Sequence, residues 1–176
     1  MKAFALLSCL ALVGCATGYQ PQSFTGGYSD FLQAPDVATI TFRGNGYTDA
    51  LRAVEMAALH CCDVTLQHGY RYCVLVGAGD LSRTSSFTTP GYAYTSRSAF
   101  GTYGGGFANV YGSTSTTYSP PMTHTFYKPA FVLTIKMGND AAALAPLGVV
   151  INGIKAQPKD AAFVGASLRQ HLGIQQ

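Results

Sequence analysis

Cysteines are the residues of this chain whose type and spacing offer the most chemistry. Five of them stand in the 176 residues, at Cys9, Cys15, Cys61, Cys62 and Cys73. A thiol can be acylated, oxidised to a disulfide or used as a metal ligand, and its surroundings decide among these. The spacing separates an N-terminal pair from a later trio, so two kinds of chemistry are expected.

The N-terminal pair lies in a segment with the layout of a secretory signal. Lys2 supplies a positive charge, residues 3–13 are nearly all apolar, and small residues follow. This run is shorter than the ~20 apolar residues that a bilayer-spanning helix needs. Its ending, Leu12-Val13-Gly14-Cys15, resembles a bacterial lipobox. The resemblance implies that residues 1–14 are a signal peptide and that Cys15 becomes the lipidated first residue, because cleavage before Cys9 would leave too short an apolar region. An ordinary signal peptide with an incidental cysteine is the alternative.

Lipid on Cys15 would make the membrane a partner of this chain. Several acyl chains on one residue hold a protein firmly at a bilayer without spanning it. Ala16, and not Asp, follows Cys15, which by analogy with lipoprotein sorting in diderm bacteria favours the outer membrane over the inner membrane. We therefore expect a lipid-anchored protein of the bacterial cell envelope.

The composition argues against nucleic acid as a partner. Charged residues make up 11% of the chain, well below the ~25% of ordinary soluble domains. Removal of Lys2 leaves 10 of the 11 basic side chains against 8 acidic ones. That excess is too small and too dispersed for the clustered basic face of a nucleic-acid-binding domain.

Three strands are predicted within one domain at residues 36–176, which follows a tether at residues 15–35. Residues 37–43 alternate apolar and polar side chains with the period of a strand. Residues 70–77 are almost continuously apolar, as in the centre of a sheet. Residues 128–138 alternate again and are expected to pair with residues 70–77.

The main helix is predicted from Asp49 to His68. Thr48 is its expected N-cap and Gly69 its stop. At ~100° per residue, one side of the helix should pack on the sheet and the other should face solvent. The first side holds Leu51, Val54, Ala58, Cys61 and Thr65, and the second holds Arg52, Met56, His60, Asp63 and Gln67.

The C-terminal region is predicted to add a short helix at residues 141–145, ended by Pro146, then a short strand or buried turn at residues 147–154. A last helix should begin at Pro158 and run to Leu172. The fold class is therefore α+β: a small, mostly antiparallel sheet with one main helix packed on it and a C-terminal helix.

Four segments carry a resemblance to a known family. They are Gly27-Tyr28-Ser29-Asp30, Phe42-Arg43-Gly44-Asn45-Gly46-Tyr47-Thr48, Gly69-Tyr70-Arg71-Tyr72 and Tyr127-Lys128-Pro129. Together they are similar to a family of uncharacterised proteobacterial lipoproteins with a lipobox, an FRGNGYT segment and a GYRY strand. The family offers no established activity or active-site residue. Cys73 departs from its pattern, which implies an aromatic residue after Tyr72.

The later trio of cysteines admits a disulfide in an oxidising envelope. Cys61 precedes Gly69 by ~12 Å of helix and Cys73 follows it by ~13 Å of strand, so antiparallel packing would bring the two to one level. We predict a bond between Cys61 and Cys73, or between Cys62 and Cys73, that stabilises the fold by about 2–3 kcal/mol. Three buried, reduced thiols are the equal alternative.

No cofactor, metal or catalytic site is predicted. The set of His60, Cys61, Cys62, His68 and Cys73 lacks the C-x₂-C and H-x₃-H spacings of metal sites. The sequence has no Gly-x-Ser-x-Gly nucleophile motif, and no histidine has a carboxylate or nucleophile at an informative spacing.

Residues 82–126 interrupt the domain with a tract rich in Ser, Thr, Gly and Tyr. A compact domain rarely holds so long a structureless loop, so the tract should be either disordered or a long hairpin turning at Gly104-Gly105-Gly106. Its aromatic side chains either stack on a glycan, a peptide or a partner's surface or cover the edge of the sheet, and pairing between copies is a third interpretation. The candidate contacts are Tyr92, Tyr94, Tyr103, Phe107, Tyr111 and Tyr118.

These features predict a non-catalytic envelope lipoprotein that binds a protein or glycan partner or has a structural role. The alternative is an envelope hydrolase, or a lipoprotein that senses redox state or stress through its cysteines. The sequence names no ligand and sets no oligomeric state.

Overall fold

The computed structural model describes residues 16–175, with the side chain of Phe107 excepted. The chain divides into two compact units, of which the first comprises Met1–Thr84 with Tyr127–Gln176 and the second comprises Ser85–Phe126. Helices and an antiparallel sheet lie in the first unit, so the predicted α+β class is confirmed.

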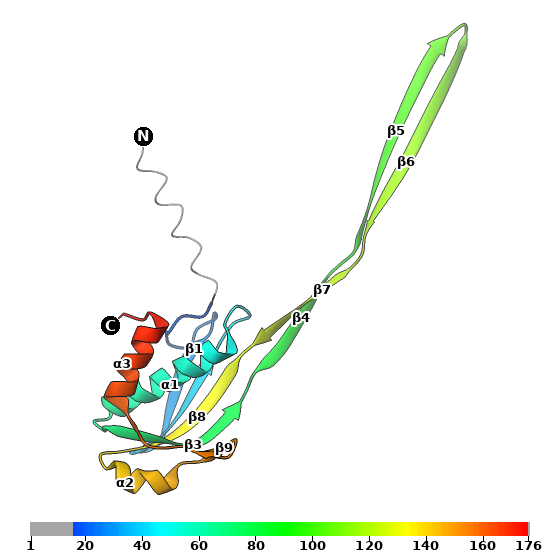
Figure 1. Ribbon diagram of the computed structural model, residues 1–176. Coiled ribbons are helices and arrows are strands. Elements are labelled where there is room, and N and C mark those ends of the chain that lie inside the picture. Colours follow the sequence, from blue (N-terminus) through cyan, green and yellow to red (C-terminus); the bar gives the residue numbers. More distant parts are fainter. Residues whose placement is uncertain (1–15, 176) are drawn as a thin grey trace, which may run out of the picture. The chain divides into compact units, whose positions relative to one another are not determined.

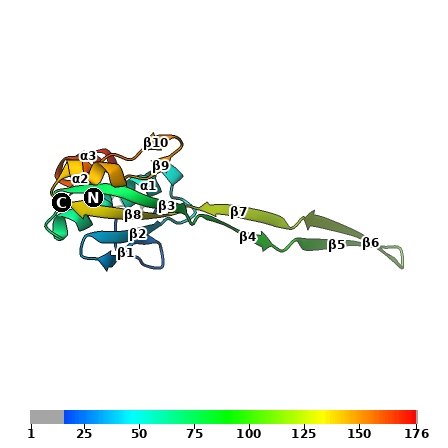
Figure 2. The same ribbon diagram turned by 90° about the horizontal axis from the view of Figure 1, so that it is seen from below.

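The sheet of the first unit has five strands in the order β1-β2-β8-β3-β11, and every neighbouring pair is antiparallel. The strands are β1 (Gly27–Ala34), β2 (Val37–Arg43), β3 (Tyr72–Asp80), β8 (Ala130–Gly138) and β11 (Lys159–Asp160). β8 pairs with β3 as predicted, and it also pairs with β2 on its other side (Figure 2). The last long strand of the chain is therefore central to the sheet.

Helix α1 (Ala50–Gln67) lies across the sheet and begins and ends at recognisable signals (Figure 1). The Asp49 carboxylate accepts hydrogen bonds from the amides of Leu51 and Arg52 at 2.8 and 3.3 Å, so Asp49 is the N-cap and the prediction of Thr48 was wrong by one position. Gly69 follows the helix with φ +76°, a conformation that disfavours other residues. The helix thus ends where predicted.

The predicted solvent face of α1 is wrong in its middle, where side chains are buried, whereas Arg52 and Gln67 are exposed as predicted. On the side predicted to pack on the sheet, Leu51 is 66% exposed, so that prediction is wrong at the start of the helix.

Met56 and His60, which helical periodicity placed on the solvent face, are 0% and 4% exposed. Helix α3 (Ala161–Leu172) and the segment before β1 pack there, since Leu172 and Tyr19 join the apolar cluster that contains Met56. The periodicity of a helix does not show whether segments distant in the sequence will pack on its polar face.

The predicted tether also differs from the structure. β1 pairs with β2 from Gly27 opposite Arg43 to Ala34 opposite Val37. Further upstream, buried Thr17 donates its amide hydrogen to the Thr48 hydroxyl oxygen at 3.0 Å. Backbone pairing and polar contacts hold this segment, and neither leaves an apolar period in a sequence. Ordered structure therefore starts well before residue 36.

The C-terminal region follows the prediction except at the start of the last helix. Asp160 caps α3 through the Phe163 amide at 3.2 Å, because Lys159 and Asp160 first pair with β3. The predicted start at Pro158 was therefore too early. The preceding elements are α2 (Ala141–Leu144), a 3₁₀ turn at Ala145–Leu147 that contains the predicted stop, β9 (Val150–Ile151) and β10 (Ile154–Lys155).

The second unit contains the predicted hairpin. β5 (Tyr92–Gly104) and β6 (Phe107–Ser119) are antiparallel in an unbroken register that ends with Gly104 opposite Phe107. The turn residues Gly105 and Gly106 have φ of +62° and +85°, as a two-residue type I′ turn requires. β4 (Arg83–Thr89) pairs with β7 (Met122–Lys128).

Among residues 16–175, no helix has the length and apolar character needed to cross a membrane.

Candidate functional site

The three later cysteines converge between α1 and β3. Cys61, Cys62 and Cys73 are buried and are free thiols in the structure, without the predicted disulfide. The neighbouring Cys62 side chain lowers the pKa of the Cys73 thiol. Burial raises the pKa of Cys61. Cys61 and Cys73 belong to one core cluster, and both predicted pairings stay predictions.

The most extensive polar cluster is centred on buried His60. Its Nε2 atom lies 2.8 Å from Oδ1 of Asp30 on β1, and its Nδ1 atom lies 3.0 Å from the hydroxyl oxygen of Tyr19. The ring of Tyr28 stacks on the imidazole, with ring centres 3.8 Å apart. Thus the N-terminal segment and β1 supply every one of these contacts to the helix.

Asp63, one turn further along α1, extends the cluster to α3. Its carboxylate accepts hydrogen bonds from the Tyr19 hydroxyl and from Nη2 of Arg169. Burial and the Asp63 carboxylate raise the pKa of Tyr19 well above its ordinary value. The phenol is therefore held in its neutral, donating form.

Both ring nitrogens of His60 have a hydrogen-bond partner in this cluster. The Tyr19 hydroxyl donates its hydrogen to the Asp63 carboxylate. Which ring nitrogen of His60 carries a hydrogen depends on the tautomer, and both nitrogens already have a partner within the cluster. The cluster therefore joins the N-terminal segment, β1 and α3 to α1.

Sequence reasoning missed this cluster. Asp30 and Tyr19 precede His60 by 30 and 41 positions, and the helical pattern placed His60 in solvent. A buried polar side chain needs partners, but no signal in the sequence shows that His60 is buried. In the part of the chain that the structure describes, no group of three His, Cys, Asp or Glu side chains is placed to hold a metal ion.

The predicted contact residues of residues 82–126 lie on the hairpin of β5 and β6. Since side chains alternate between the faces of a strand, the register puts Tyr92, Tyr94 and Tyr111 on one face and Tyr103 and Tyr118 on the other. All five are between 67% and 91% exposed. The side chain of Phe107 lies outside the described part, as does the predicted lipidation site, Cys15.

The hairpin has no core of its own. Every described side chain from residue 91 to residue 118 is exposed. Hydroxyl groups face one another across the strands: Thr95 and Thr116 at 3.1 Å, and Ser98 and Ser113 at 2.6 Å. Side-chain hydrogen bonds of this kind pair the two strands but remove little apolar surface from water.

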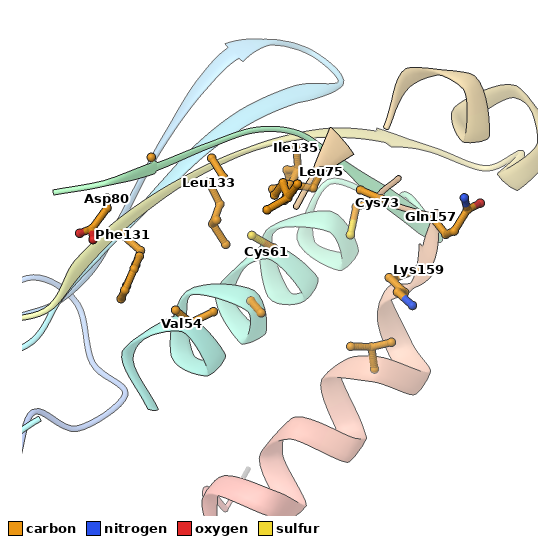
Figure 3. A pocket seen from close by; sticks show the side chains of 16 residues that line it. Val54, Cys61, Cys73, Leu75, Asp80, Phe131, Leu133, Ile135, Gln157 and Lys159 are labelled. Atoms are coloured by element: carbon orange, nitrogen blue, oxygen red, sulfur yellow. The ribbon is translucent and has the colours of Figure 1, made fainter. Parts of the chain in front are cut away.

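An apolar cavity of about 550 Å³ lies in the first unit between α1 and the sheet (Figure 3). Val54, Ala58 and Cys61 line it from the helix, and Leu75, Leu133 and Ile135 are among the residues that line it from the sheet. The helix side chains belong to the stripe predicted to pack on the sheet. In the structure, part of that stripe borders open space.

Comparisons with family models, curated proteins and solved structures find no match to this chain. The resemblance to the proteobacterial lipoproteins stays a prediction.

Proposed function

We propose that this chain is a non-catalytic lipoprotein of the bacterial envelope, anchored in the outer membrane through Cys15, and that its hairpin of β5 and β6 assembles with the hairpins of further copies. The observation that carries the proposal is the exposure of the hairpin. Within residues 16–175, its two strands of 13 residues each pair only with each other. An isolated two-stranded hairpin is marginally stable in water at best, so pairing with another chain would stabilise it.

A second copy is the partner that the strand edges fit. Proteins usually protect free edges with charged side chains, proline or bulges. The two strands contain one charged residue, Arg97, and no proline, and their register is unbroken. An edge of this kind can pair with the same edge of another copy.

The N-terminal segment supports display close to a membrane surface. Thr17 is fixed by its hydrogen bond to Thr48 and by the hydrogen bond that its hydroxyl donates to the Thr25 carbonyl oxygen at 2.7 Å. A single residue, Ala16, separates Thr17 from Cys15. Lipid on Cys15 would hold the first unit near the bilayer, without a long spacer.

One observation favours a second candidate function. Cys61 and Cys73 pack in one core cluster, and the neighbouring Cys62 side chain lowers the pKa of Cys73, as redox sensing by a reversible disulfide would require. The alternative of an envelope hydrolase gains no such support, because both ring nitrogens of His60 are engaged within the cluster.

Photo-crosslinking in cells tests the assembly. A photoreactive phenylalanine placed at Tyr94 of the full chain should give crosslinked dimers, whereas the same probe at Phe163, which is 74% exposed on α3, should not. Peptide mapping must then place the crosslink in residues 92–119 of a second copy. Crosslinks to glycan, or to other proteins alone, would contradict the proposal.

A proline variant separates edge pairing from hairpin folding. In a two-residue hairpin the closing pair, Gly104 and Phe107, is hydrogen-bonded, and such pairs alternate with pairs whose amides point outward. Thr116 lies in an outward pair and Thr117 in a hydrogen-bonded pair. Thr95, the partner of Thr116 on β5, also has an outward amide. Thr95→Pro and Thr116→Pro together, with one proline on each free edge, should therefore remove the dimer crosslink and keep the hairpin, while Thr117→Pro should disrupt the hairpin itself.

Cell fractionation tests the anchor. The Cys15→Ala variant should lose the acyl-dependent association with the outer membrane that the unsubstituted chain shows. Persistence of that association in the variant would contradict lipidation at Cys15. Crosslinking at Tyr94 tests the assembly of the hairpins independently of this result.

A further inference from the structure

The cavity between α1 and the sheet is a built site for an apolar group. Its volume of about 550 Å³ falls within the ~300–1,000 Å³ typical of ligand pockets. Phe131, Leu133 and Ile135 supply its floor from β8, Val54 and Ala58 supply one wall from α1, and Val164 contributes from α3. Because these elements are held by the sheet register and by the contacts of α1 with α3, the cavity is preformed.

The polar groups of the cavity lie at its ends. Gln157 and Lys159 stand together at one end, and Asp80 stands at the other, beyond Phe131 (Figure 3). Asp80 is already engaged, since its carboxylate accepts the amide hydrogen of Ser82 at 2.7 Å. Lys159 is exposed and, within residues 16–175, takes part in none of the ion pairs.

This layout fits a ligand with one apolar chain and one anionic end. Methylene groups gain free energy on leaving water for the apolar walls, by ~0.8 kcal/mol each. An ammonium group and an amide donor at one end can hold a carboxylate, whereas a cationic head would meet like charge there. The Cys61 and Cys73 side chains, which also line the cavity, add to its apolar wall.

We infer that this cavity binds a long-chain carboxylate, with the alkyl chain between α1 and β8 and the carboxylate at Lys159 and Gln157. This inference is independent of the hairpin and of lipid on Cys15.

Photoaffinity labelling of the full chain in membranes tests the inference. The probe is a long-chain carboxylate with a diazirine in its chain and a terminal alkyne. Its crosslinks should map to α1, β8 and the start of α3. Excess hexadecanoate should abolish them, whereas a quaternary ammonium compound of equal chain length should not.

Variants on two walls fill the cavity. Ala58→Phe and Val164→Phe should each abolish labelling in protein whose fold is intact by circular dichroism. If Ala58→Phe does not fold, Val164→Phe alone tests the cavity. Lys159→Gln should reduce labelling by about threefold, as expected for a partly solvated ion pair. Lys155→Gln, on β10 outside the cavity, should leave labelling unchanged and is the matched control.

Three results would overturn the inference. The first is labelling of the cavity that both phenylalanine variants leave unchanged in folded protein. The second is an equal loss of labelling in the Lys159→Gln and Lys155→Gln variants. The third is displacement by a single-chain phosphatidylglycerol but not by hexadecanoate, which would assign the cavity to a phospholipid.

Discussion

Asp63 joins three parts of the first unit. Its replacement by asparagine measures what these contacts contribute to the free energy of unfolding. The carboxylate accepts from Tyr19, ahead of β1, and from Arg169 on α3. An asparagine at this position would keep the shape of the side chain, but it would lose the charge and turn an amide donor toward one of the two donors. Arg169 would remain as an unpaired, partly buried cation.

The expected loss of unfolding free energy follows from how exposed the two paired side chains are. The side chains of Asp63 and Arg169 are 15% and 22% exposed, between the surface pairs that contribute ~0–1 kcal/mol and the buried pairs whose disruption costs ~3–5 kcal/mol. Since a hydrogen bond to a charged group contributes ~1.5–3 kcal/mol and two such bonds are affected, we expect Asp63→Asn to lower the free energy of unfolding by about 3 kcal/mol.

Urea unfolding followed at 222 nm is the assay. The helices that the structure describes lie in the first unit, so this signal reports on the unit that contains Asp63. With a slope of ~2 kcal/mol per molar urea, the midpoint should fall by about 1.5 M. The double variant with Arg169→Gln should lose less than the sum of the single variants, because it no longer leaves a cation unpaired.

Asp36→Asn is the matched control. Asp36 pairs with Lys136 at 2.5 Å, but the two side chains are 35% and 31% exposed, so its replacement should cost no more than ~1 kcal/mol. Equal losses in Asp63→Asn and Asp36→Asn, or additive losses in the double variant, would refute the role assigned to the Asp63 junction.

Two further predictions concern Tyr19 and the cysteines. The raised pKa of Tyr19 means that its contribution to stability is fully present below pH 10, the ordinary value, and is lost as the pH rises above it, because the unfolded chain then ionises first. The difference in unfolding free energy between the unsubstituted chain and Tyr19→Phe should therefore shrink above pH 10 in urea titrations, and a constant difference would contradict the burial of this phenol. For the predicted disulfide, the denatured, unreduced mature protein should contain one free thiol, and three would refute both pairings. Cys62→Ser protein should then contain two free thiols if Cys62 pairs with Cys73 and none if Cys61 does.

Local sequence pattern was sufficient for the elements whose signals are local. β2 was predicted with its observed bounds because apolar and polar residues alternate along it, and α1 because an apolar period is followed directly by its glycine stop. The hairpin of β5 and β6 was one of two alternatives predicted for residues 82–126, and its turn was predicted at Gly104-Gly105-Gly106. In each case the physical preference acts between residues a few positions apart.

Tertiary structure alone decided which surfaces meet. The pattern of α1 could not show that Tyr19, Tyr28 and Asp30 would cover His60, because their contacts are backbone pairing and hydrogen bonds across 30 or more positions. It also could not show that Val54 and Ala58 would border a cavity, since an apolar stripe looks the same whether packing is complete or leaves a gap. Burial is a property of the packed arrangement, and periodicity reports only which side chains share a face.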